Sequence, residues 1–188
     1  MRILEYFDTV IALDDGGDDV HALRARLVAA DCAPIVVDLT APEGWRARLA
    51  PLLAGPRLSR VTGVLVLSPA PGADRELWKS QDRMVERLEC KDWEIVFLGH
   101  REGADCVPDD LRPDLIECDA VPAGLSAIAL RWRTLDSVIE LMPDRATDGP
   151  LSPTDWLTIA SWIAHPLPRS SRPLFAWPPL LGSRPLPH

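Results

Sequence analysis

The stretch from residue 61 to residue 99 places the strongest constraint on the fold. An apolar run, VTGVLVL, is followed by a Pro/Gly turn, by a segment with helical spacing of apolar residues, and by a second apolar run entered through an Asp-Trp pair. We expect strands at Val61–Leu67 and Trp93–Leu98 and a helix at Arg75–Leu88. A strand–helix–strand unit of this kind builds a parallel sheet, so the sequence predicts an α/β fold.

The same alternation extends toward the amino terminus, where apolar runs again alternate with helical patterns. The strands expected there are Thr9–Leu13 and Ala33–Leu39, and the helices are His21–Ala30, capped by Asp18 or Asp19, and Pro42–Leu53. Crossovers between parallel strands are right-handed and put helices against the sheet. The sequence therefore predicts a Rossmann-like, mostly parallel sheet with helices on both faces.

The pattern is weaker after Gly99. We expect short strands at Leu115–Cys118 and Leu125–Leu130 and helices at Arg133–Met142 and Thr154–Ala164. Ten of the 19 prolines follow Met142. Proline has no backbone N–H to donate inside a sheet, so this Pro-rich tail is expected to run over the surface in extended form. With no internal repeat and no clear linker, the sequence predicts one domain over residues 1–188.

Composition excludes several classes of protein. The net charge of -8 argues against a nucleic-acid binder, because phosphate contacts need a basic surface. No apolar stretch reaches the roughly 18 residues that a membrane-spanning helix requires, and the first residues lack the pattern of a signal peptide. A cytoplasmic location is expected. The four cysteines and four histidines are scattered without a CxxC pair, which argues against a zinc or redox site.

An acidic cluster comes directly after the first expected strand, at Asp14, Asp15, Asp18 and Asp19. Ligands bind at the carboxyl ends of strands in open α/β sheets, and several carboxylates there can hold a divalent cation. The alternative is a solvated turn before a helix N-terminus, which favours negative charge. The cluster lacks GxGxxG, so a classical dinucleotide site is not expected.

Three further polar residues are candidates. Ser68 and Ser126 follow or begin apolar runs, but neither lies in a GxSxG motif, so both are expected to be turn and strand residues rather than nucleophiles. Asp155 begins an expected helix after a Pro/Gly/Ser loop. Its carboxylate either interacts with the helix dipole or faces a cleft as a general base.

Several segments occur together in an order that resembles a known family. They are EYFDTVIAL, VLVL, DWEIVFLG, GLSAIALRWRTLDSVIEL, SPTDWL and LFAWPPLLGSRPLPH. The chain resembles glycosyltransferase family 25, of the lipooligosaccharide galactosyltransferase type, over nearly its whole length. The resemblance implies a GT-A-like fold, a nucleotide-sugar donor, a hydroxyl acceptor, and a divalent cation, Mn or Mg, that neutralises the diphosphate leaving group.

The chain departs from this family at the metal motif. In the family the VLVL strand runs into Glu-Asp-Asp, whereas here the matching positions hold Ser68, Pro69 and Ala70. The resemblance makes Asp155 the catalytic base or the acid that orients the acceptor, and leaves Asp74 and Glu76, together with Asp14 and Asp15, as candidates for the metal. It also puts Ser68, with Pro69 and Ala70, at the mouth of the nucleotide-sugar pocket, where Asp14, Asp15 and Ser68 are the candidate cofactor-binding residues. Loss of the motif favours a pseudoenzyme or a metal-independent variant as much as an active transferase.

A second resemblance covers the first 70 residues. The segments LDDGG, ARLVAADCAPIVVDL and VTGVLVLSPAP are similar to the non-catalytic half of polyketide ketoreductases. That half is a truncated Rossmann-like subdomain without a cofactor motif. It implies a structural or partner-binding domain with a protein partner instead of a substrate, and the two interpretations stay open at this point.

Overall fold

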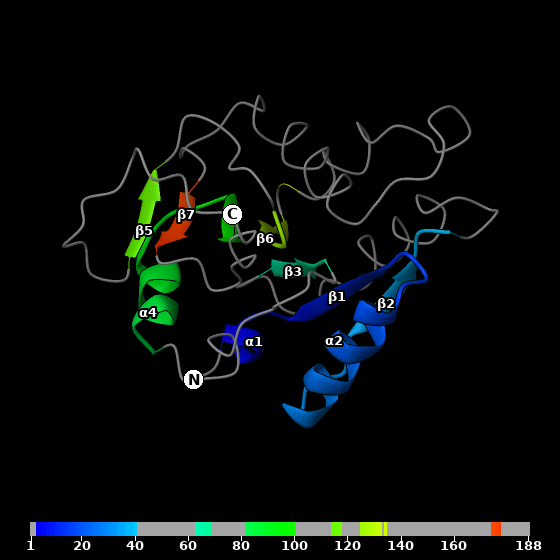
Figure 1. Cartoon of the computed structure of the whole chain (residues 1–188). Helices are drawn as coiled ribbons and strands as arrows, with labels where there is room; N and C mark the ends of the chain where they lie inside the picture. The colour runs from blue at the N-terminus through cyan, green and yellow to red at the C-terminus, as the bar shows by residue number, and fades with distance from the viewer. Residues whose placement is uncertain are drawn as a thin grey trace, which may run out of the picture.

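The computed structural model describes residues 3–40, 63–68, 82–100, 114–117, 125–132, 134 and 174–177. Three helices and four strands are described in the first hundred residues, and the labelled elements beyond them are strands (Figure 1). The elements are α1 Ile3–Tyr6, β1 Thr9–Asp14, α2 Asp18–Ala29, β2 Ile35–Asp38, β3 Gly63–Leu67, α4 Asp82–Cys90, β4 Ile95–Gly99, β5 Asp114–Glu117, β6 Ala127–Arg131 and β7 Leu174–Trp177.

The seven strands form one mixed sheet in the order β2-β1-β3-β6-β4-β7-β5. Strand β1 pairs in parallel with β2 and β3, and β4 pairs in parallel with β7. Strand β6 runs antiparallel to both β3 and β4, and β5 runs antiparallel to β7. The α/β class predicted from the sequence is confirmed, but the expected parallel succession is wrong at its centre, because β6 separates β3 from β4.

Burial explains why the direction of β6 could not be read from the sequence. Residues 127–130 are buried, as are all five residues of β3 and of β4. A strand covered on both faces has an uninterrupted apolar sequence, and that sequence is the same for either direction. The strand was therefore predicted at the right place and its direction was not.

The start of α2 differs from the expected cap. The N-cap is Gly17, without a side-chain hydrogen bond, and Asp18 and Asp19 lie in the first turn of the helix. The expectation that one of these two aspartates caps the helix is wrong. Their charges favour the helix instead through its dipole, whose positive end is at the N-terminus.

The Pro-rich tail also differs from expectation at one point. Residues 174–177 form β7, which lies between β4 and β5 inside the sheet rather than on the surface. This LFAW segment contains no proline, although prolines flank it at positions 173 and 178. Its backbone N–H groups are therefore available for pairing, and the proline count of the tail concealed a strand. The rest of the tail lies outside the described residues.

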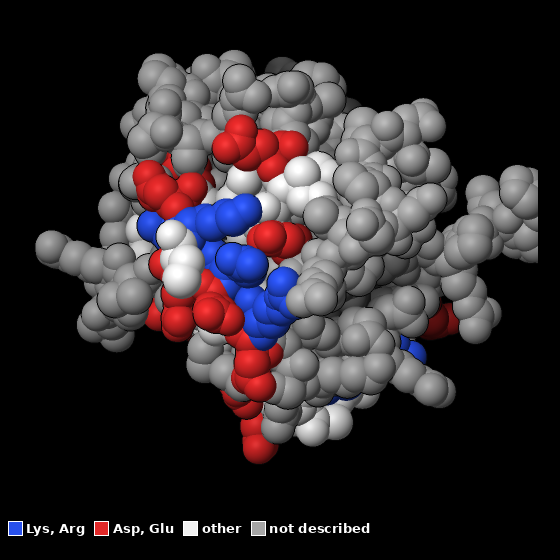
Figure 2. Space-filling model, turned by 90° about the vertical axis from the view of Figure 1, so that its left-hand side faces the viewer, with Lys and Arg blue, Asp and Glu red and all other residues white. Residues whose placement is uncertain are grey.

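Ion pairs join α4 to β5 at one end of the sheet. Arg87 and Lys91 approach the Asp114 carboxylate at 3.3 Å and 3.5 Å, and the Lys91 Nζ also donates to the Leu115 carbonyl. Figure 2 views this side of the molecule and shows basic side chains flanked by acidic ones. Such mixed charge stabilises local packing only weakly.

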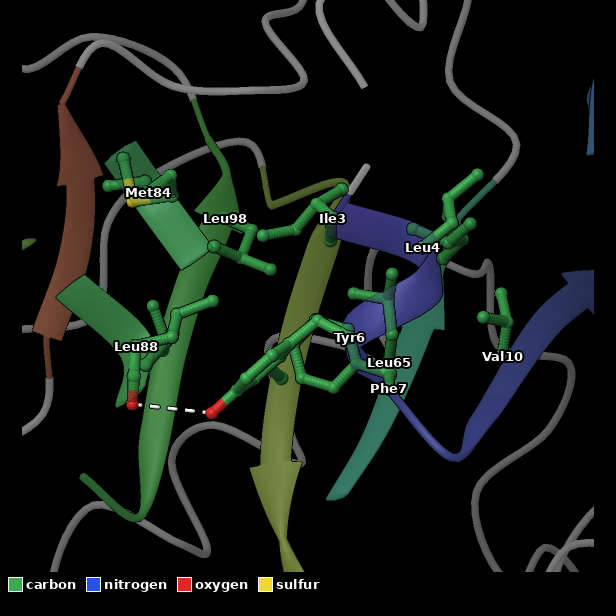
Figure 3. Packing of buried hydrophobic residues seen from close by; sticks show 14 of the residues in the cluster. Ile3, Leu4, Tyr6, Phe7, Val10, Leu65, Met84, Leu88 and Leu98 are labelled. Carbon is green, nitrogen blue, oxygen red and sulfur yellow. Dashed lines mark hydrogen bonds between the residues drawn. The ribbon is translucent and has the colours of Figure 1, made fainter. Parts of the chain in front are cut away.

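A cluster of buried hydrophobic residues covers one face of the sheet. Corresponding positions on adjacent strands, such as Val10, Leu65 and Ala129, present side chains to this face. Helices α1, α2 and α4 all contribute to the same cluster, and Figure 3 shows the residues of α1 and α4 meeting over the strands. The Tyr6 hydroxyl, from α1, donates to the Leu88 carbonyl of α4 at 3.3 Å. This bond ties the chain's first helix to the helix before β4.

The opposite face of the sheet is buried as well. Ile11, Val66, Ile128 and Phe97 project to that side and are at most 1% exposed. Burial on both faces agrees with the α/β prediction. The three described helices cover one face, and the helices expected at 42–53 and 154–164, together with nearly all of the one at 133–142, lie outside the described residues. Among the described helices, none is long and apolar enough to cross a membrane.

Candidate functional site

Five strands of the sheet, β1, β2, β3, β4 and β7, run in one direction, so their last residues share one edge, which we call the carboxyl edge. Polar residues gather there at the ends of β1, β2, β3 and β4. The oppositely directed β6 begins at the same edge, just after Ser126. Among the described residues, those polar residues at the ends of β1 to β4 and before β6 are Asp14, Asp15, Asp38, Thr40, Ser68, His100 and Ser126. The structure therefore brings the predicted Asp14, Asp15 and Ser68 to one edge, as the sequence indicated.

The outer part of the edge, at the ends of β1 and β2, is open and acidic. Asp14 and Asp38 are register partners at the ends of these two strands. The Asp14 Oδ1 accepts a 2.7 Å bond from the Gly16 amide, and the Asp15 Oδ1 accepts one of 3.0 Å from the Gly17 amide. Gly16 has φ of +81°, a conformation that suits glycine. These carboxylates thus stabilise the turn that connects β1 to α2.

The end of β2 is built in the same way. The Asp38 Oδ1 accepts bonds of 2.7 Å from both the amide and the hydroxyl of Thr40. The Leu39 amide donates to the Asp14 carbonyl at 2.7 Å and joins the two turns. Aspartate side chains bond to the backbone two residues later in many turns. These contacts support the interpretation of the acidic cluster as a turn before a helix N-terminus.

The described acids do not fit a divalent cation. No group of three or more His, Cys, Asp or Glu side chains among the described residues is arranged to hold a metal ion. One oxygen each of Asp14, Asp15 and Asp38 is already an acceptor within a turn. The predicted ligands Asp74 and Glu76, and the predicted base Asp155, lie outside the described residues. The described residues therefore give no metal ion a role in a reaction at this edge.

The inner part of the edge, at the ends of β3 and β4, is buried, and the residues described there include no carboxylate. Ser68 is 2% exposed, and its amide donates to the Ser126 carbonyl at 2.9 Å. Its hydroxyl has no hydrogen-bond partner in the part of the chain that the structure describes. A buried hydroxyl without a partner costs about 1–3 kcal/mol, and such groups are rare in native proteins. The side chain therefore calls for an explanation beyond a turn residue.

His100 is a second buried polar residue of the inner part, 2% exposed, and the sequence analysis did not single it out. Its Nε2 lies 3.0 Å from the Ala176 carbonyl oxygen, and its ring meets Phe175 edge-on with centroids 5.4 Å apart. A carbonyl oxygen only accepts hydrogen bonds, so Nε2 is the donor of this contact. Both contacts come from β7, which the sequence did not predict, so no local signal marked this histidine.

Ser126 connects the two strands of the inner part. Its carbonyl accepts from the Ser68 amide, and its own amide donates to the Gly99 carbonyl at 2.9 Å. The backbone around β6 is thus held on both sides, which gives the inner edge a rigid frame.

No protein-family model, curated protein or solved structure matches the chain.

Proposed function

We propose that this chain is a divergent glycosyltransferase-like protein that binds a nucleotide sugar at the carboxyl edge and transfers the sugar to a hydroxyl acceptor. The observation that supports this most is the position of Ser68. This residue stands where the resembling family has its acidic motif, and it lies at the sheet edge where α/β proteins bind ligands. Its buried hydroxyl, without a described partner, is suited to bind a ligand oxygen.

Binding without a metal follows from the same residues. The described carboxylates do not form a cation site, and at the inner edge the Ser68 hydroxyl is a neutral hydrogen-bonding group. In this proposal the ligand is held by hydrogen bonds at the inner edge rather than through a cation. Asp155 is the proposed base that removes the acceptor's proton, a role that rests on the resemblance alone.

Nucleotide binding is tested by thermal unfolding of the full chain with uridine and guanosine diphosphates, in EDTA and with manganese. We expect one nucleotide to raise the melting temperature in EDTA, because a ligand that binds only the folded state stabilises it. Stabilisation that appears only with manganese would instead favour a cation held by Asp74 and Glu76. A flat response to every nucleotide would count against the transferase proposal as a whole.

Three variants test the roles of named residues. Ser68→Ala should leave the fold as stable or slightly more stable and weaken nucleotide binding at least fivefold, because it removes the unpaired hydroxyl. Thr134→Val is the matched control, since it removes another buried hydroxyl, one that bonds the Glu94 carbonyl at the opposite edge. Equal nucleotide affinity of the wild type and Ser68→Ala would remove Ser68 from the site. Asp155→Asn should abolish turnover without unfolding the chain.

The second candidate is a non-catalytic, partner-binding domain resembling the structural half of polyketide ketoreductases. It is favoured by the lack of a metal-binding group and the uncharged inner edge among the described residues. This candidate predicts no nucleotide response and a stable complex with one defined partner chain. A monomer that binds a nucleotide contradicts it.

A further inference from the structure

We draw no further inference here: the strongest candidate, the buried Ser68 hydroxyl at the inner part of the carboxyl edge, belongs to the site already described, and nothing else among the described residues shows which ligand group would meet it.

Discussion

The parallel half of the sheet, β2-β1-β3, and the mixed half, β6-β4-β7-β5, follow different rules. In the parallel half, the neighbouring strands come from the first 67 residues and all run in one direction. In the mixed half, the neighbours come from residues 95–177, and their order in the sheet is unrelated to their order in the chain. The difference teaches that apolar runs identify strands, whereas the neighbours of a strand depend on packing between distant segments.

The largest expected effect is at the junction of the two halves. A Cβ added to Gly63 would lie 2.2 Å from the Leu130 carbonyl oxygen of β6, and backbone cannot move aside. We expect Gly63→Ala to cost more than about 3 kcal/mol of unfolding free energy, measured by urea denaturation. In contrast, Gly16→Ala, where the nearest atom is 3.9 Å away and only the positive φ is strained, should cost about 1–2 kcal/mol. An unchanged urea midpoint for Gly63→Ala would mean that β3 and β6 are not paired in this way.

The second-largest effect is expected on the unfolding free energy when one core position from each half is shortened. Trp93, just before β4, is fully buried, donates to the Leu88 carbonyl at 2.9 Å, and has the Arg131 guanidinium 4.6 Å above its ring. We expect Trp93→Ala to cost about 3–5 kcal/mol and Ile11→Val, in β1, about 0.5–1.5 kcal/mol. Both values come from urea denaturation monitored by circular dichroism. A loss of under about 1 kcal/mol for Trp93→Ala would contradict the central role given to this side chain.

A smaller effect is expected in the turn at the end of β1. Asp14→Ala removes the acceptor of the Gly16 amide and should cost about 1 kcal/mol. Asp14→Asn keeps a side-chain oxygen at the same place and should retain most of the stability. If both variants are equally destabilised, the charge of the Asp14 carboxylate contributes more to stability than its hydrogen bond to the Gly16 amide. Full stability of Asp14→Ala would show that the turn does not need this bond.

The smallest effect concerns Tyr6, the chain's single tyrosine. Burial raises the pKa of its hydroxyl above the ordinary value of 10.0, and the positive charge of Arg131 opposes the shift. The neutral form is favoured in the folded state, so stability is retained below about pH 10 and declines as the pH rises above that value.

The check on Tyr6 is a phenolate absorbance titration of the folded chain, together with urea denaturation at several alkaline pH values. Tyr6→Phe is the control and should decline less steeply with pH, since it lacks the titrating group. A phenolate that forms at the ordinary pKa in the folded chain would show that Tyr6 is not buried against α4.

Local pattern predicted most of the strands and part of the site. The strand expected at Thr9–Leu13, before a helical pattern, is β1 in the structure. Asp14 and Asp15 could be placed at the carboxyl edge because they come after the apolar run of that strand. In contrast, β7 is a four-residue run between prolines, too short to stand out from the tail. His100 could not be singled out, because its partner Ala176 belongs to β7. The unpaired hydroxyl of Ser68 is a property of packing, which a sequence pattern does not record.

The position of β7 also bears on how this chain matures in the cell. During synthesis the residues of β5 leave the ribosome well before residues 174–177, which supply their neighbour in the sheet. Until that late segment emerges, the nascent polypeptide has a seam that a chaperone can recognise. Completion of the sheet therefore waits for residues 174–177, and a stop codon placed before residue 174 would leave a product without β7 and prone to degradation.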